Sequence, residues 1–218
     1  MTRQALLLLC LVGLLCGTGQ AAIQFDPQTM LRTSELQAGM KGVCKTVLKG
    51  TTIEEFPVEI TGVLEKVWNG GDIILFRITA GPLVEKKMGI LSGMSGSPIF
   101  INGKLAGAVS LSFDYMMREP MGGATPIEQM IQPGQPPAPE QTTLLRPQHP
   151  VTIAGRRMSQ FVLAPPGSSV MPTLSTAVLR PVLTPLFVSG LRPDAIASLR
   201  PTFEGRGFRL YPGPGQMN

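Results

Sequence analysis

The sequence predicts a mainly β fold, either a barrel or a sandwich, and three observations lead to this prediction. Alternating or densely apolar segments of strand length occur at residues 42–48, 56–67 and 73–78. Glycine-rich turns separate these segments, and Asn102-Gly103 joins two further apolar runs at residues 98–101 and 105–111. Short strands connected by turns favour a barrel or a sandwich over an alternation of strands and helices.

The most informative stretch begins at Gly93, where the chain reads Gly-Met-Ser-Gly-Ser-Pro-Ile before it enters the predicted hairpin. The hairpin turn at Asn102-Gly103 is expected because a tight I′ turn needs positive φ at both central residues. Glycines near Ser95 suit a turn that exposes the hydroxyl and leaves backbone amides unpaired. Taken alone, Gly-x-Ser-Gly is also compatible with an ordinary polar turn.

A short helix is expected after the predicted barrel strands. Thr125, Pro126 and Glu128 have the spacing of a capping box, with Thr125 as N-cap, Pro126 at the first helical position and Glu128 reaching back. The helix is expected to run through Met130.

Composition limits the classes of function. The chain has 218 residues, of which 43% are hydrophobic and 15% charged, enough for one core. The net charge of +5 comes from scattered Lys and Arg residues with little aromatic interleaving, so we expect no nucleic-acid partner.

Residues 1–22 are expected to be a secretory signal peptide. Arg3 supplies the positive end, residues 5–15 form an apolar run, and Gly-Gln-Ala-Ala at residues 19–22 resembles a cleavage region. The run is short for a bilayer span, which needs about 20 residues, although an uncleaved anchor is the alternative. We therefore expect a secreted or periplasmic protein with no stable membrane insertion after cleavage.

Three cysteines are present, and two of them, Cys10 and Cys16, fall in the predicted signal peptide. Cys44 would remain alone in the mature chain, which excludes an internal disulfide and a cysteine metal cluster. Cys44 lies in an alternating segment and is expected to be a small buried residue. No cofactor or metal is expected.

Beyond Met130 the character of the chain changes, because 15 of its 21 prolines lie there. Residues 23–131 are the predicted β domain, residues 132–175 a Pro/Gln-rich linker, and residues 176–218 a partial, partly disordered C-terminal extension.

The motifs together resemble a known family. The serine segment is similar to that of chymotrypsin-like serine peptidases and closer to the stage IV sporulation protein B peptidase family. Further stretches that agree with this family are Gly-Met-Lys-Gly at residues 39–42, Lys-Thr-Val-Leu-Lys-Gly-Thr at 45–51, Glu-Phe-Pro-Val-Glu-Ile at 55–60, Gly-Val-Leu at 62–64 and Gly-Ala-Thr-Pro-Ile-Glu-Gln-Met at 123–130. The resemblance implies a partial chymotrypsin-like fold of the double-barrel type and a chain similar to the N-terminal part of a larger secreted member.

The resemblance also implies catalytic roles. Ser95 corresponds to the nucleophile, and the amides of Gly93 and Ser95 correspond to the oxyanion hole. The single histidine, His149, is the available base, although it lies in Gln-His-Pro where the family has Gly-His-Pro. Larger secreted relatives are expected to carry that motif further downstream.

The catalytic acid has no clear candidate in the sequence. Ala80 stands where sporulation members have an aspartate, and Asp72 and Asp114 are the available carboxylates, both also compatible with turns. Ser110 aligns with a Thr or Ser close to the family's site and is expected to support it.

Two functions follow. The first is a secreted serine endopeptidase domain that hydrolyses a polypeptide through an acyl-enzyme on Ser95. The second is a truncated or non-catalytic exported relative that binds a peptide or a partner in the same cleft.

Overall fold

The computed structural model describes residues 23–68, 71–113, 119–132, 141–147, 150–153 and 155–213. Its strands are β1 (Lys41–Thr46), β2 (Glu54–Trp68), β3 (Gly71–Ile78), β4 (Pro98–Ile101), β5 (Lys104–Phe113), β6 (Met121–Pro126), β7 (Thr143–Leu145), β8 (Val151–Ile153), β9 (Arg156–Met158), β10 (Gln160–Leu163), β11 (Thr176–Pro181), β12 (Thr184–Val188) and β13 (Phe208–Pro212). The helices are the 3-10 turn η1 (Thr33–Glu35), α2 (Pro82–Glu85), α3 (Ile127–Met130) and α4 (Pro193–Glu204). The predicted signal peptide, residues 1–22, lies outside the described residues.

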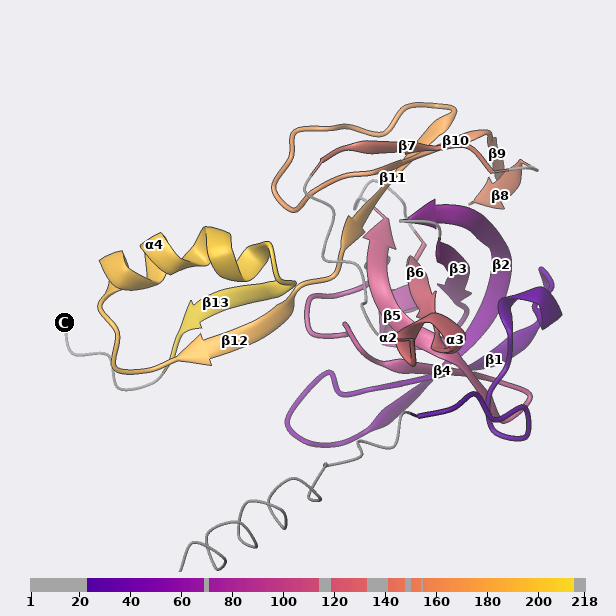
Figure 1. The fold of residues 1–218 in the computed structure, drawn as a ribbon, viewed down its shortest axis with the longest axis horizontal. Coiled ribbons are helices and arrows are strands. Elements are labelled where there is room, and N and C mark those ends of the chain that lie inside the picture. Colours follow the sequence, from indigo (N-terminus) through magenta and orange to yellow (C-terminus); the bar gives the residue numbers. More distant parts are fainter. Residues whose placement is uncertain are drawn as a thin grey trace, which may run out of the picture.

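Six strands form a closed antiparallel barrel in the order β4-β1-β2-β3-β6-β5, and the pairing of β4 with β5 closes it (Figure 1). The prediction of a mainly β fold is therefore confirmed, and the barrel is consistent with a chymotrypsin-like fold. Closure leaves the barrel strands without a long free edge, which removes a site of unwanted strand pairing.

The hairpin between β4 and β5 turns where the sequence predicts. Asn102 has φ 51° and Gly103 has φ 78°, so both central residues occupy the left-handed region that the I′ turn requires. This hairpin matters for the site because β4 begins directly after the serine turn.

Alternation along the strands fills the barrel interior. In β1 the inward residues Cys44 and Thr46 are buried while Lys45 between them is exposed. In β4 Ile99 and Ile101 are fully buried, and Phe100 faces outward. The outer face of β1 and β4 therefore carries Lys45 and Phe100 side by side.

The range 132–175, predicted as a linker, is more ordered than the sequence indicates. Its described residues include β7, β8, β9 and β10, and β10 pairs with both β7 and β11 to extend the sheet from the end of β5. Buried residues such as Phe161 and Leu163 build a second core cluster with Leu75 and Leu111. Burial of these apolar side chains stabilises the strands, and the prolines of this range lie in the segments between the strands.

The C-terminal extension contains a β12–α4–β13 unit in which β12 and β13 are parallel, and Figure 1 shows it to one side of the barrel. Pro181 ends β11, and Pro185 lies in β12, an edge strand where a missing N–H is tolerated. Leu210 and Ile196 are buried between the helix and the strands.

The predicted capping box is wrong. Helix α3 starts at Ile127, its N-cap is Pro126, and no side chain caps it. The Thr125 hydroxyl instead donates to Ser110 Oγ at 3.0 Å, and the Glu128 carboxylate accepts from the Thr33 backbone amide at 2.9 Å. Tertiary partners thus use both side chains that the local spacing assigns to the helix end.

Candidate active site

Two overlapping β-turns hold the Ser95 segment. The Met94 amide donates to the Leu91 carbonyl (3.1 Å), and the Ser97 amide donates to the Met94 carbonyl (3.0 Å). Gly93 and Gly96 occupy the third position of each turn with φ of 98° and 82°, the conformation that a type II turn needs at this position. The glycine spacing of the motif therefore dictates the shape of the turn.

The core and β5 anchor this turn from below. The Met94 side chain is buried, with 1% of its surface exposed, and packs into the barrel core. The Gly96 amide donates to the Val109 carbonyl (2.8 Å), and the Val109 amide donates to the Ser97 carbonyl (2.9 Å). Ser95 lies between these anchors and is half-buried.

The backbone amides of the serine turn fall into two groups, those that donate a hydrogen bond and those that do not. Within the described part of the chain, the amides of Met94, Gly96 and Ser97 donate hydrogen bonds, whereas those of Gly93 and Ser95 have no acceptor. Amides left without a partner beside a nucleophile are available to a developing oxyanion. These are the two amides that the sequence assigns to the oxyanion hole.

The serine turn borders a hollow of about 420 Å³ on the outer face of β1 and β4. Its lining residues are Lys45, Thr46, Val47, Ile53, Gly93, Ser95, Gly96, Ser97, Pro98 and Phe100. Ligand pockets commonly have volumes of about 300–1,000 Å³, so the hollow is large enough to accept a side chain of a substrate.

The neighbouring Ser97 has a structural partner that the sequence does not reveal. Its hydroxyl donates to Thr46 Oγ1 at 2.7 Å, and both residues are buried. The bond ties the start of β4 to β1. The only signal for it in the sequence is that alternation in β1 places Thr46 inward with Cys44.

Lys45 is the one titratable residue that lines this hollow among the described residues. Its ammonium pairs with Glu55 Oε1 at 2.8 Å and lies 5.6 Å from the centre of the Phe100 ring. The strand register explains the pair, because Lys45 lies opposite Glu55 in β1 and β2.

The other predicted site residues lie elsewhere or outside the described part. His149 and Asp114 fall outside the described residues, so the role of His149 as base stays a prediction. Asp72 accepts hydrogen bonds from the Lys66 amide (2.9 Å) and the Thr33 hydroxyl (3.0 Å), which is structural use near the β2–β3 turn.

Ser110 does not line the Ser95 hollow. Its hydroxyl accepts from Thr125, and its backbone carbonyl accepts from the Val182 amide (2.8 Å). Ser110 directly follows Val109, whose backbone holds the serine turn, so its contacts support the strand under the site.

Cys44 is fully buried, as predicted, and burial raises the pKa of its thiol to about 12. A thiol that stays protonated at neutral pH is a poor nucleophile, so Cys44 belongs to the core and not to the chemistry.

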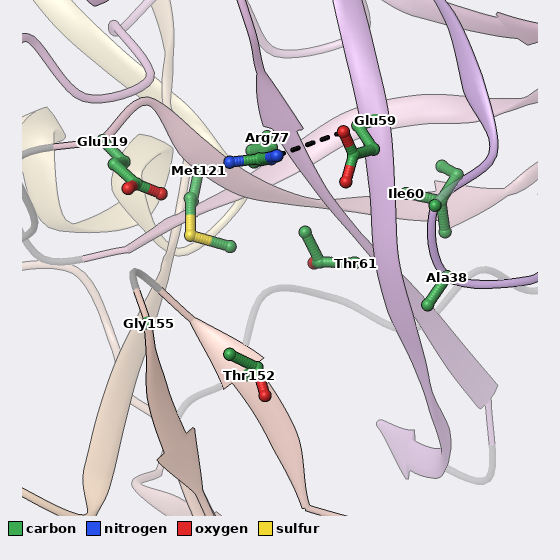
Figure 2. Close-up of a pocket in the computed structure, with 10 residues that line it drawn as sticks. Ala38, Glu59, Ile60, Thr61, Arg77, Glu119, Met121, Thr152 and Gly155 are labelled. Carbon is green, nitrogen blue, oxygen red and sulfur yellow. Dashed lines mark hydrogen bonds and ion pairs between the residues drawn. The ribbon is translucent and has the colours of Figure 1, made fainter.

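A second hollow of about 290 Å³ lies between β2, β3 and the β8–β9 hairpin (Figure 2). Arg77 and Glu59 form an ion pair at its wall at 3.1 Å, and Thr61 projects a buried hydroxyl without a hydrogen-bond partner in the described structure. None of the described residues lines both hollows, so this one is separate from the Ser95 turn.

A Gly-x-Ser-Gly turn directly before β4 of a closed antiparallel barrel is consistent with a serine peptidase domain of chymotrypsin-like type. The family model described as SpoIVB peptidase S55 matches residues 13–131, more than half of the chain. The chain belongs to this family, and its barrel is a SpoIVB-type serine peptidase domain. Comparisons with curated proteins and with solved structures find no match.

Proposed function

We propose that the domain is a serine endopeptidase in which Ser95 attacks a peptide carbonyl. The Ser95 Oγ–carbonyl carbon bond forms as a base takes the hydroxyl proton, and the negative charge on the carbonyl oxygen is met by the Gly93 and Ser95 amides. The base then gives its proton to the leaving amine, and water hydrolyses the acyl-enzyme. The observation that carries the proposal is the pair of unpaired amides that flank Met94, in a turn held in place by the hydrogen bonds of the Met94, Gly96 and Ser97 amides.

We assign the base to His149, the single histidine of the chain. A serine hydroxyl at neutral pH is a weak nucleophile unless an adjacent base activates it. Support for this assignment is chemical, since imidazole is the commonest base in serine hydrolysis.

A fluorophosphonate probe tests the proposal because it labels only activated serines. We expect labelling of the wild-type chain and its loss in Ser95→Ala and His149→Ala, with labelling retained in Ser159→Ala, a matched exposed serine. Peptide mapping of the labelled chain should place the adduct on Ser95 and not on Ser97. Labelling that survives Ser95→Ala would overturn the assignment.

A non-catalytic exported relative that binds a peptide is the second candidate. The feature that favours it is the lining of the hollow: no described residue there offers an imidazole or a carboxylate to Ser95, and Lys45, which does line it, is paired with Glu55. Under this alternative the wild-type chain resists the probe yet still binds peptides in the hollow.

Export of the chain is part of the proposal. The apolar run at residues 5–15 and the small residues that follow it support a cleaved signal peptide. In the described part of the chain no helix combines the length and the apolar character of a membrane span. N-terminal sequencing of the exported protein should begin near residue 22 or 23, whereas an intact Met1 would indicate an anchor.

A further inference from the structure

We infer that the Ser95 hollow and the exposed face of β12 select a polypeptide segment with large apolar side chains next to the bond that Ser95 attacks. This inference rests on the proposed peptidase function and adds the class of substrate. It follows from three features of the structure: apolar residues exposed around the hollow, a charge that is already neutralised, and an exposed aromatic pair on the strands next to the serine turn.

The first feature is the rim of the hollow. Val47 and Ile53, in the connection between β1 and β2, keep 40% and 67% of their surface exposed although they lie beside Ser95. Together with the outward ring of Phe100 they form an apolar wall. Exposed apolar side chains gathered around a concave site are typical of a surface that binds an apolar group.

The second feature concerns charge. Among the described residues that line the hollow, Lys45 alone is charged, and Glu55 compensates it at 2.8 Å. A basic substrate side chain would meet the ammonium, and an acidic one would have to compete with Glu55 for it. An uncharged side chain leaves the pair intact and gains contact with the wall.

The third feature is the face of β12 that looks away from α4. A β-carbon added to Gly93 would lie 3.7 Å from the Pro185 ring, so the start of β12 packs directly on the oxyanion turn. Phe187, two residues further, shares the face of Pro185 and lies about 7 Å along the strand. It stacks on Tyr211 of β13 with ring centres 5.6 Å apart.

The stacked side chains of Phe187 and Tyr211 are exposed to solvent and are not part of a hydrophobic core. Phe187 keeps 66% and Tyr211 36% of its surface accessible, while Leu210 on the opposite face is covered by α4. The strand that packs on the serine turn through Pro185 therefore presents an exposed aromatic pair two residues further along the same face. A polypeptide is the occupant that fits, because it supplies a carbonyl to Ser95 and side chains on both sides of it.

Binding to the full-length Ser95→Ala chain tests the inference without requiring turnover. The probes are fluorescein-labelled alanine-based hexapeptides that carry Phe, Lys or Asp at one central position, measured by fluorescence anisotropy. We expect the Phe peptide to bind roughly tenfold more tightly than the Lys and Asp peptides, a modest share of what full burial of an aromatic side chain yields.

Two variants on this background locate the binding surface. Ile53→Asp should remove most of the preference for Phe, whereas Leu174→Asp, at a residue 81% exposed and outside the Ser95 hollow, should leave it unchanged. Phe187→Ala should weaken a peptide with a second Phe several residues away more than the single-Phe peptide. Thermal unfolding of each variant verifies that the fold is retained.

The outcomes separate the inference from the proposed function. Equal affinity for the three peptides, or equal effects of Ile53→Asp and Leu174→Asp, would overturn the inference even if the wild type reacts with fluorophosphonate. A preference for Phe in a chain that never labels would support the apolar site and refute the peptidase. A dimer that dissociates in Ile53→Asp and excludes the peptides would show that a second copy covers this surface instead.

Discussion

Removing the Ser97 hydroxyl should destabilise the barrel without removing the nucleophile. Ser97 Oγ and Thr46 Oγ1 are 2.7 Å apart, and the two residues expose only 7% and 5% of their surface. In the described structure neither hydroxyl has another hydrogen-bond partner. In Ser97→Ala the Thr46 hydroxyl stays buried and unsatisfied, which costs about 1–3 kcal/mol. For a chain of this length, such a loss lowers Tm by roughly 2–12 °C.

A double-mutant cycle isolates the bond. Thr46→Val alone should cost a similar amount, and Ser97→Ala/Thr46→Val should recover part of the loss because neither buried polar group then lacks a partner. Urea unfolding of the four proteins, with the exposed Ser159→Ala as control, gives the coupling free energy. If the two single losses simply add, the hydroxyls do not stabilise each other and the reasoning is wrong.

Two further predictions follow from the packing. Gly42→Ala should lower the free energy of unfolding by roughly 1–3 kcal/mol, at the top of that range, because the new β-carbon overlaps the Phe100 carbonyl oxygen of the paired strand. The control is Gly89→Ala, where nothing lies within 4 Å of the new β-carbon. Equal urea midpoints for the two variants would refute the steric argument. Cys44 should resist iodoacetamide at pH 8 in the folded chain and react in urea, as peptide mapping would show. Because burial raises the pKa of its thiol from 9.0 to about 12, the unfolded chain loses this proton first, so stability should fall as pH rises from about 9 to 12.

Local patterns predicted the parts of the fold that depend on local chemistry. Apolar patterning identified five of the six barrel strands and missed β6 (Met121–Pro126), which contains two glycines. Asn102-Gly103 identified the hairpin because positive φ at two successive residues is a local requirement. The capping box failed because Thr125 and Glu128 found partners in Ser110 and Thr33, which are distant in the sequence. Propensity cannot anticipate a competitor that only the folded chain brings near.

The candidate site also has a part that local sequence predicts and a part that depends on contacts between distant segments. The turn around Ser95 and its unpaired amides follow from two glycines with fixed spacing, so the sequence was sufficient for them. The packing of Pro185 on Gly93 was not predictable, since about 90 residues separate them and β11 must first align on β5 to bring β12 there. Proline-rich composition even argued against order in the intervening range, where buried Phe161 and Leu163 nevertheless build a sheet.

Activity depends on the identity of the base, and two candidates can be compared by mutation: His149 and the lysine that lines the hollow. Lys45 lines it with Ser95, and a lysine can serve as a base only when its amine has lost a proton. Here the ammonium donates to Glu55 at 2.8 Å, and a protonated amine has no lone pair with which to accept the serine proton. Lys45→Met should therefore preserve fluorophosphonate labelling of Ser95, whereas His149→Ala should abolish it. The reverse result would make Lys45 the base and the Glu55 pair a resting state that substrate must break, and Glu55→Gln would then accelerate labelling.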